Sequence, residues 1–391
     1  MKFFAKLLVA PAAIGLVAPI SVSANELNLD GIESYSFQEE IETEEFNSST
    51  FSNELASEAI LPTYKTGNTY SEFEAGSFSE TTVMSATAQF ALAGASGDIA
   101  GMGDEEAIHA AYYFDIDLDT SFTGEDNLNV GIEAGNNPDT AVLGSTGLDF
   151  GTAAGDELKV VDINYTRSFG DLTLQVGDSL DISSQFTGAC AYSGFHDTLA
   201  SCGTGASAGV EGDVTLTGNY DLGNGFTVGA GISGSEGSTT KGLFTKESSD
   251  LYGVQLAYAA DSYGAAVTYV NSDTTSTDTT YWGLNGYYTI GSTIDSISVG
   301  YETGNPTGSG ADTSNWFAGL TTGEVGPGVF NLGVGTVGHT TEAQDELLLY
   351  ELSYGWDIND STSATLGVFQ EERATGNDDL TGLALTTTFS F

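Results

Sequence analysis

The stretch AYYFDIDLDTSFTGEDNLNVGIEA, residues 111–134, decides the fold. Its first half alternates apolar residues with acidic ones. The apolar positions are Tyr112, Phe114, Ile116 and Leu118, and the acidic positions are Asp115, Asp117 and Asp119. After a short turn the second half alternates Leu128, Val130, Ile132 and Ala134 with Asn129, Gly131 and Glu133. This period of two predicts two strands, each with one apolar and one wet face.

The same unit recurs to the end of the chain. The predicted strands lie near 82–94, 108–120, 127–134, 158–168, 171–178, 212–220, 226–233, 251–259, 263–271, 281–289, 296–303, 315–322, 329–336, 347–356, 362–370 and 381–391. Short links alternate with longer ones, which is typical of outer-membrane barrels with periplasmic turns on one rim and extracellular loops on the other. We therefore expect an all-β fold, an up-and-down antiparallel transmembrane barrel of about sixteen strands.

Aromatic pairs and the last strand agree with a barrel. Four pairs lie six residues apart on one strand face: Tyr252 with Tyr258, Tyr263 with Tyr269, Trp282 with Tyr288, and Tyr350 with Trp356. Aromatics near both ends of an apolar band suit two membrane interfaces. The alternative is the core of a soluble β-sandwich. In the final strand Phe389 and Phe391 share the apolar face, and Phe391 is the last residue.

The first eighty residues differ from the rest. Lys2 and Lys6 precede a mostly apolar run, and Val22-Ser23-Ala24 offers small residues before a cleavage site. Residues 1–24 are thus predicted to be a signal peptide. Residues 25–80 are acidic and aperiodic, which favours a mostly unstructured lead-in or a small plug. The barrel is expected over 81–391.

Charge narrows the classes of function. The chain carries 8 Lys plus Arg against 55 Asp plus Glu. No basic footprint remains to bind phosphates, so nucleic acid is not an expected partner. The acidity has two interpretations that the sequence leaves open: solubility in a salty habitat, where salt screens repulsion between like charges, or a channel that attracts cations.

Chemistry-bearing motifs are sparse. The three histidines lie in no nucleophile or metal motif such as G-x-S-x-G or H-E-x-x-H, so we expect no enzyme, no metal and no cofactor. After residue 24 the sequence contains no run of about eighteen apolar residues, so it predicts no transmembrane helix. The alternative function is a secreted acidic adhesin or structural protein, although the calcium-binding nonapeptide repeat is absent.

The leader Lys6-Leu7-Leu8-Val9-Ala10-Pro11-Ala12-Ala13, the segment Asn25-Glu26-Leu27-Asn28 and the closing Thr388-Phe389-Ser390-Phe391 resemble cyanobacterial outer-membrane porins. That family is similar to carbohydrate-selective porins. The resemblance implies a homotrimer in a Gram-negative outer membrane, among lipid and lipopolysaccharide. It also implies that Phe389 and Phe391 form a signal for the barrel-assembly machinery, and that small solutes, ions and sugars pass. Residues 25–80 show no S-layer-homology pattern, so the resemblance does not extend to cell-wall anchoring.

The lumen of a sixteen-stranded barrel is too wide for side chains to fill. On length and resemblance, the longest link, 179–211, is expected to fold inward as a constriction loop rather than outward. Cys190 and Cys202 are expected to form a disulfide within it, as befits an exported protein. The candidate constriction residues are Asp178, Asp181, Phe186, Tyr192, Phe195, His196 and Asp197. The aromatics among them suit either sugar stacking or packing against the wall.

Acidic residues at inward positions form the other candidate site. They are Asp115, Asp117, Asp119, Glu133, Asp162 and Glu351. Carboxylates in a narrow throat concentrate cations and repel anions. We therefore expect a porin that passes small hydrophilic solutes by diffusion and prefers cations or neutral solutes to anions.

Overall fold

The computed structural model describes residues 81–99, 103–104, 108–136, 148, 150, 155–208, 211–235, 243, 245, 248–274, 277–308, 310–341, 344–374 and 376–391. The predicted signal peptide, 1–24, and the predicted lead-in, 25–80, lie outside the described residues. In the part of the chain that is described, no helix is long and apolar enough to cross a membrane.

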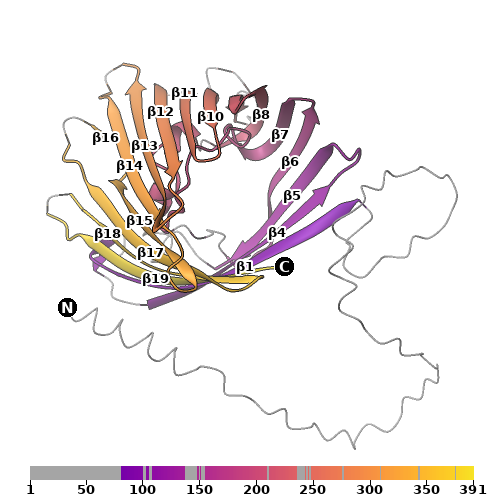
Figure 1. The fold of residues 1–391 in the computed structure, drawn as a ribbon. Coiled ribbons are helices and arrows are strands. Elements are labelled where there is room, and N and C mark those ends of the chain that lie inside the picture. The colour runs from indigo at the N-terminus through magenta and orange to yellow at the C-terminus, as the bar shows by residue number, and fades with distance from the viewer. Residues whose placement is uncertain are drawn as a thin grey trace, which may run out of the picture. The chain divides into compact units, whose positions relative to one another are not determined.

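Sixteen antiparallel strands form a closed barrel (Figure 1). They are β1 (Thr82–Ser96), β4 (Ile108–Thr120), β5 (Asp126–Gly135), β6 (Lys159–Phe169), β7 (Leu172–Asp181), β8 (Glu211–Gly223), β9 (Phe226–Gly234), β10 (Asp250–Ala259), β11 (Tyr263–Asp273), β12 (Asp278–Thr289), β13 (Ile294–Pro306), β14 (Thr313–Thr322), β15 (Gly328–Thr336), β17 (Leu348–Asn359), β18 (Thr362–Glu371) and β19 (Leu380–Ser390). Each predicted strand overlaps one of them, so the predicted fold class is confirmed.

Short strand segments accompany the barrel. β2 (Asp98–Ile99) and β3 (Gly103–Asp104) pair with each other in the link between β1 and β4. β16 (Thr340–Thr341) pairs with β14 beyond the end of β15. The barrel closes because β1 pairs with β4 on one side and with β19 on the other.

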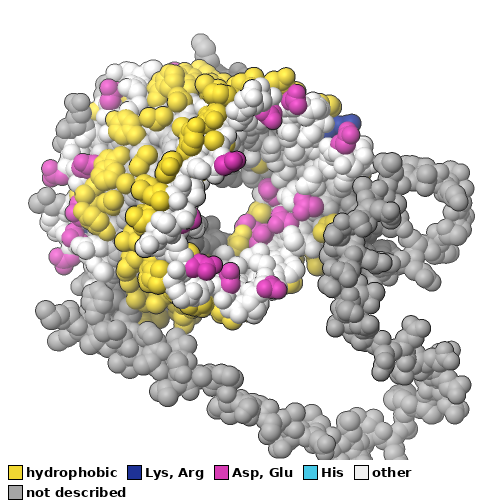
Figure 2. Space-filling view, in the orientation of Figure 1, with side chains coloured by type: hydrophobic (Ala, Val, Ile, Leu, Met, Phe, Trp, Pro, Cys, Tyr) yellow, Lys and Arg dark blue, Asp and Glu magenta, His cyan; other side chains and the backbone are white. Residues whose placement is uncertain are grey.

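The two faces of each strand differ in exposure, as β10 illustrates. Tyr252, Val254 and Leu256 are exposed, whereas Gly253 and Gln255 between them are buried. Because every second side chain of a strand points to the same face, the apolar residues face outward and the small and polar residues face inward. Figure 2 shows the resulting apolar cover over the outside of the strands.

Aromatic side chains from neighbouring strands meet in two rows. In one row the Tyr269 ring lies 6.5 Å from that of Tyr252 and 5.0 Å from that of Trp282. In the other row the Tyr258 ring lies 5.6 Å from that of Tyr263. Tyr252 and Tyr258 are six residues apart on one strand, so about 20 Å separates the rows. This spacing suits two interfaces of an apolar band about 25 Å tall.

The connections alternate in length between the two rims. One rim carries tight turns such as 170–171, 224–225 and 360–361, and the other carries the links 182–210 and 337–347. Asn224 and Gly225 both have positive φ, 56° and 84°, as two-residue hairpins that match the strand twist require.

The last residue completes the seam between β19 and β1. The Phe391 amide donates to the Ala86 carbonyl at 3.0 Å, and the Ala86 amide donates to the Phe391 carbonyl at 2.8 Å. The rings of Phe389 and Phe90 meet edge to face at 6.0 Å. The C-terminal aromatics therefore lie on the outer face, where the first and last strands join.

Candidate functional site: the barrel interior and its inner loop

The link between β7 and β8 turns inward as soon as β7 ends. We call its described residues, 182–208, the inner loop. The hydroxyl of Thr217 on β8 donates to the Ile182 carbonyl at 2.7 Å, and the hydroxyl of Thr215 donates to the Leu180 carbonyl at 2.6 Å. Both threonines are buried at inward positions. Ile182 itself is fully buried, so the chain enters the barrel instead of rising from its rim.

Glycines on the inner face let the loop lie directly against the wall. A Cβ added at Gly300 would lie 1.5 Å from the Cys202 carbonyl oxygen, and one added at Gly367 would lie 2.6 Å from the Phe195 ring. The inner-face glycines that a Cβ would drive into the loop are Gly229, Gly231, Gly253, Gly283, Gly300, Gly319, Gly333, Gly335 and Gly367. They belong to strands from β9 to β18, so the loop crosses the interior to the far wall.

The middle of the loop is a ring closed by the disulfide Cys190–Cys202, whose Cα atoms are 6.3 Å apart. It contains the short helix α4 (Asp197–Ala200). Tyr192, Phe195 and Leu199 from this ring are buried in one apolar cluster with wall residues such as Phe317 on β14. These aromatics therefore pack the ring onto the wall and leave no free face for sugar stacking.

Glu351 on β17 binds the ring from the barrel wall. Its Oε1 accepts from the Tyr192 hydroxyl at 2.5 Å and from the Phe195 amide at 3.0 Å, and its Oε2 accepts from the His196 amide at 2.7 Å. Burial and the Glu351 carboxylate raise the pKa of the Tyr192 hydroxyl, which keeps it protonated as a donor. Glu351 was predicted as an acid of the open lumen, but its exposed fraction is only 5% because the ring covers it.

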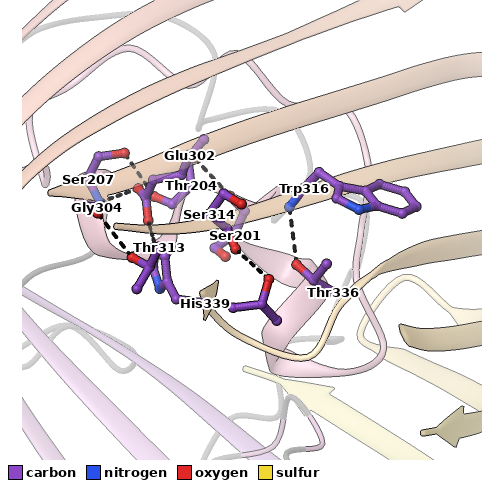
Figure 3. Close-up of polar contacts among 11 residues, drawn as sticks. Ser201, Thr204, Ser207, Glu302, Gly304, Thr313, Ser314, Trp316, Thr336 and His339 are labelled. Carbon is purple, nitrogen blue, oxygen red and sulfur yellow. Dashed lines mark hydrogen bonds and ion pairs between the residues drawn. The ribbon is translucent and has the colours of Figure 1, made fainter. Parts of the chain in front are cut away.

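Glu302 on β13 holds the end of the loop (Figure 3). The Ser207 amide, in the short helix α5 (Gly205–Ala208), donates to Glu302 Oε2 at 2.6 Å. His339 Nε2 lies 2.6 Å from the other oxygen, Oε1. The Glu302 side chain has no exposed surface. One buried carboxylate thus connects the inner loop, the wall and the link between β15 and β17.

The inner faces of β4, β5 and β6, next to β7, form a surface that we call the acidic wall. Asp115 pairs with Glu133 across β4 and β5, and Asp162 on β6 accepts the Gly131 amide at 2.8 Å. Figure 2 shows Asp and Glu side chains gathered beside the hollow in the barrel. Five predicted lumen acids share this face: Asp115, Asp117, Asp119, Glu133 and Asp162.

Side-chain amides link the acidic wall to the inner loop. Each step of this polar chain is a hydrogen bond between neighbouring strands or between β7 and the loop. The steps are Asn129 to Asp117 at 3.1 Å, Asn164 to Asn129 at 3.2 Å, Gln175 to Asn164 at 2.9 Å and Gln185 to Gln175 at 2.7 Å. The amides carry no charge, so they orient the carboxylates without neutralising them.

Few cations balance these acids. Among the described residues the basic side chains are Lys159, Arg167 and Arg373. Lys159 pairs across the strands with Glu133, because a bulge beside Gly131 shifts the register of β6. Arg373 binds Glu371 at 3.0 Å.

The remaining predicted loop residues divide between strand and loop. Asp178 is not a loop residue, which corrects the prediction: it lies in β7, where it pairs with Ile163 of β6 and Val214 of β8, and it is exposed on the outward side with Val176. Asp181 is the last residue of β7, which runs three residues further than predicted. Phe186 packs against Gly229, and Asp197 is exposed at the start of α4.

His196 is buried and caps α4, because its Nδ1 accepts the Thr198 amide at 3.3 Å. It is thus a hydrogen-bonded residue of the inner loop. In the described part of the chain, no group of three or more His, Cys, Asp or Glu side chains is arranged to hold a metal ion.

Sequence reasoning missed Glu302 and the glycine positions. The signal for Glu302 was present, since it alternates with the outward residues Val299 and Tyr301 at an inward position. What the local pattern lacked was its partner, Ser207, which lies 95 residues away.

No protein-family model and no curated protein matches the sequence. Solved structures do match. One is a loop L8 deletion mutant of OmpT, an outer membrane protein of Vibrio cholerae, with TM-score 0.57 and 13% identity over 80% of this chain and 99% of that chain. Another is an anion-selective porin from Comamonas acidovorans, with TM-score 0.54 and 15% identity over the same shares. OprB of Pseudomonas putida at low pH has TM-score 0.50 and 11% identity, over 80% of this chain and 93% of that chain. The chain shares the barrel fold of these outer-membrane proteins.

Proposed function

We propose that the chain is an outer-membrane porin of a Gram-negative bacterium, with a water-filled channel for passive diffusion of small hydrophilic solutes. The observation that carries this proposal is the closed barrel with an apolar outer face and a polar, acidic inner face. A soluble barrel has no reason to expose apolar residues around its circumference, such as Val176 on β7, Val254 on β10 and Leu366 on β18. An apolar exterior and a polar interior are what a channel in lipid requires.

The inner loop narrows this channel. It crosses the interior from β7 to the inner faces of β17 and β18, so solutes pass between the loop and the acidic wall. The disulfide Cys190–Cys202 restricts the loop to few conformations and keeps the aperture constant. Exposed loop and rim residues then sort solutes by size.

The acidic wall makes the channel prefer cations and neutral solutes, small sugars among them. Charges of one sign in a narrow passage with low-dielectric walls raise the local concentration of counter-ions. Lys159 lies opposite Glu133 in register and Arg373 forms an ion pair with Glu371, so these two cations are too few to reverse that sign. The anion-selective porin from Comamonas acidovorans shares the fold, so in our proposal selectivity follows from the lining residues.

Phe389 and Phe391 at the seam act as the signal that the barrel-assembly machinery reads, and lipid and lipopolysaccharide surround the outer face. The functional unit is a homotrimer, as in the porins that the sequence resembles.

Two measurements test the channel. Purified protein, shown to be folded by heat-modifiable migration on a gel, is added to a planar bilayer, where stepwise current increases are expected. Liposomes that contain the protein are then diluted into solutions of neutral sugars of increasing size, and swelling is expected up to a cut-off size. Folded protein that gives neither current steps nor swelling would refute the proposal and indicate a closed, structural barrel.

A further inference from the structure

Besides neutral contacts such as the hydrogen bond from Gln185 to Gln175, two buried carboxylates of the wall bind the inner loop at separate points. The disulfide ring is bound by Glu351 on β17, and α5 is bound by Glu302 on β13. Two strands, β14 and β15, lie between these points. Each anchor uses a carboxylate of the wall and backbone amides of the loop, so the attachment does not depend on the loop having any particular charged side chain.

These two carboxylates differ in kind from the acids of the open wall. Glu302 is fully buried and Glu351 is 5% exposed, so passing ions do not reach them. A buried carboxylate is costly unless donors surround it. The Phe195 and His196 amides supply such donors to Glu351, and the Ser207 amide supplies one to Glu302. If the loop left the wall, each carboxylate would lose these charge-assisted hydrogen bonds.

A second contact ties the anchor at Glu302 to the rim that carries the long links. β16 pairs with β14 at Thr340–Ser314 and Thr341–Thr313, and the Thr340 hydroxyl donates to the Ser314 carbonyl at 3.2 Å. This pairing holds residues 337–341 against the wall and brings His339 to Glu302 (Figure 3). The position of these residues and the position of α5 therefore depend on the same carboxylate.

We propose that Glu351 and Glu302 are positioning residues that hold the inner loop against the wall and set the aperture, with Glu302 also coupling the loop to residues 337–341 through His339. The inference rests on the proposed channel function. It separates two roles for the acids of the interior: the open wall selects ions by charge, whereas the buried pair determines the size and steadiness of the opening.

The test compares Glu351→Ala and Glu302→Ala with the matched control Glu324→Ala, which removes an exposed turn carboxylate. Loss of one hydrogen bond to a charged group shifts an equilibrium by about tenfold to a hundredfold. In single-channel records of folded protein, we expect the two anchor variants to raise the ratio of altered to native current levels by that factor. The reversal potential in a salt gradient should stay that of the wild type, and Glu324→Ala should change neither quantity.

A disulfide lock checks that the loop itself moves. A Cβ added at Gly283 would lie 3.2 Å from Ser207 Cβ, close to the range of about 3.5–4.5 Å for a disulfide. In the Glu302→Ala background, oxidised Ser207→Cys with Gly283→Cys should restore steady current, whereas Ser207→Cys alone should not. Steady wild-type current in both anchor variants, or a reversal potential shifted toward anions, would overturn the proposal.

Labelling of a cysteine separates this inference from the channel proposal. Ser207 is fully buried, so Ser207→Cys in otherwise native protein should resist a water-soluble maleimide. Adding Glu302→Ala should make the thiol react at least tenfold faster, whether or not the protein conducts. Equal labelling in both backgrounds refutes the anchor even if current is observed, and absence of current with unequal labelling refutes only the channel.

Discussion

Gly300 is the position where the packing of the inner loop is tightest. A Cβ there would lie 1.5 Å from the Cys202 carbonyl oxygen, whereas an ordinary contact begins at about 3.4 Å, so Gly300→Ala forces a displacement of about 1.9 Å. The oxygen belongs to backbone inside the disulfide ring and cannot rotate away as a side chain would. Overpacking of this kind costs about 1–3 kcal/mol.

The displaced ring can move only into the lumen, since β13 lies behind it. Gly300→Ala should therefore fold, as shown by heat-modifiable migration, and should give a smaller single-channel conductance than the wild type. Gly355→Ala is the matched control. Gly355 also lies at an inward position, but its added Cβ meets only the Thr365 hydroxyl at 3.5 Å, an ordinary contact. Equal conductance in both variants would refute the idea that the loop rests on the wall at Gly300.

Two further predictions concern the stability of the docked ring. Burial raises the pKa of Tyr192 in the docked loop, whereas the tyrosine of a detached loop keeps the ordinary pKa of about 10. Above about pH 10 the detached form therefore loses its proton while the docked form keeps it, and the docked state loses stability as the pH rises. Altered current levels should become more frequent above about pH 10, whereas Tyr192→Phe should show more of them at pH 7 and little further rise; a pH response retained by Tyr192→Phe contradicts this origin. The double variant Cys190→Ser with Cys202→Ser removes the disulfide, whose cysteines are 12 residues apart in sequence. Loss of this cross-link should lower the stability of the docked loop by about 3 kcal/mol. Proteolysis of the loop in folded barrels measures this, and unchanged resistance would show that wall contacts alone suffice.

The strands were predictable because the information is local. Alternation in segments such as 111–134 depends only on the period of a strand and on the two solvents that its faces meet. The alternation of short and long links then set the topology without any knowledge of pairing. The register shift beside Gly131 was not predictable, because nothing in β6 alone shows that Val161 is the extra residue.

The site was predictable only in part, because its contacts join distant residues. The acids at Asp115, Asp117 and Asp119 follow from alternation alone. Glu351 does not: alternation correctly places it on the inner side, but the ring that covers it comes from residues more than 150 positions earlier. The glycines gave no signal by themselves, since a glycine in a strand is explained only by the backbone that approaches it.

Asp178 shows how a boundary error misplaces a residue. The acid lies just before the predicted loop and was grouped with it, but β7 continues to Asp181 and pairs with β8 to its end. The period of two gives the face of a residue reliably, while the polar residues at the end of a strand resemble the loop that follows.

The most direct test of the central claim is the reversal potential of single channels in a potassium chloride gradient. Wild-type protein should give a potential of cation sign. The triple variant Asp115→Asn, Asp117→Asn and Asp119→Asn should move it toward zero, because three carboxylates of the open wall are neutralised. The control Asp171→Asn, Asp261→Asn and Asp360→Asn removes the same charge from exposed turns and should leave the potential unchanged. An anion-signed wild-type potential, or equal shifts in the two triple variants, would contradict selection by the acidic wall.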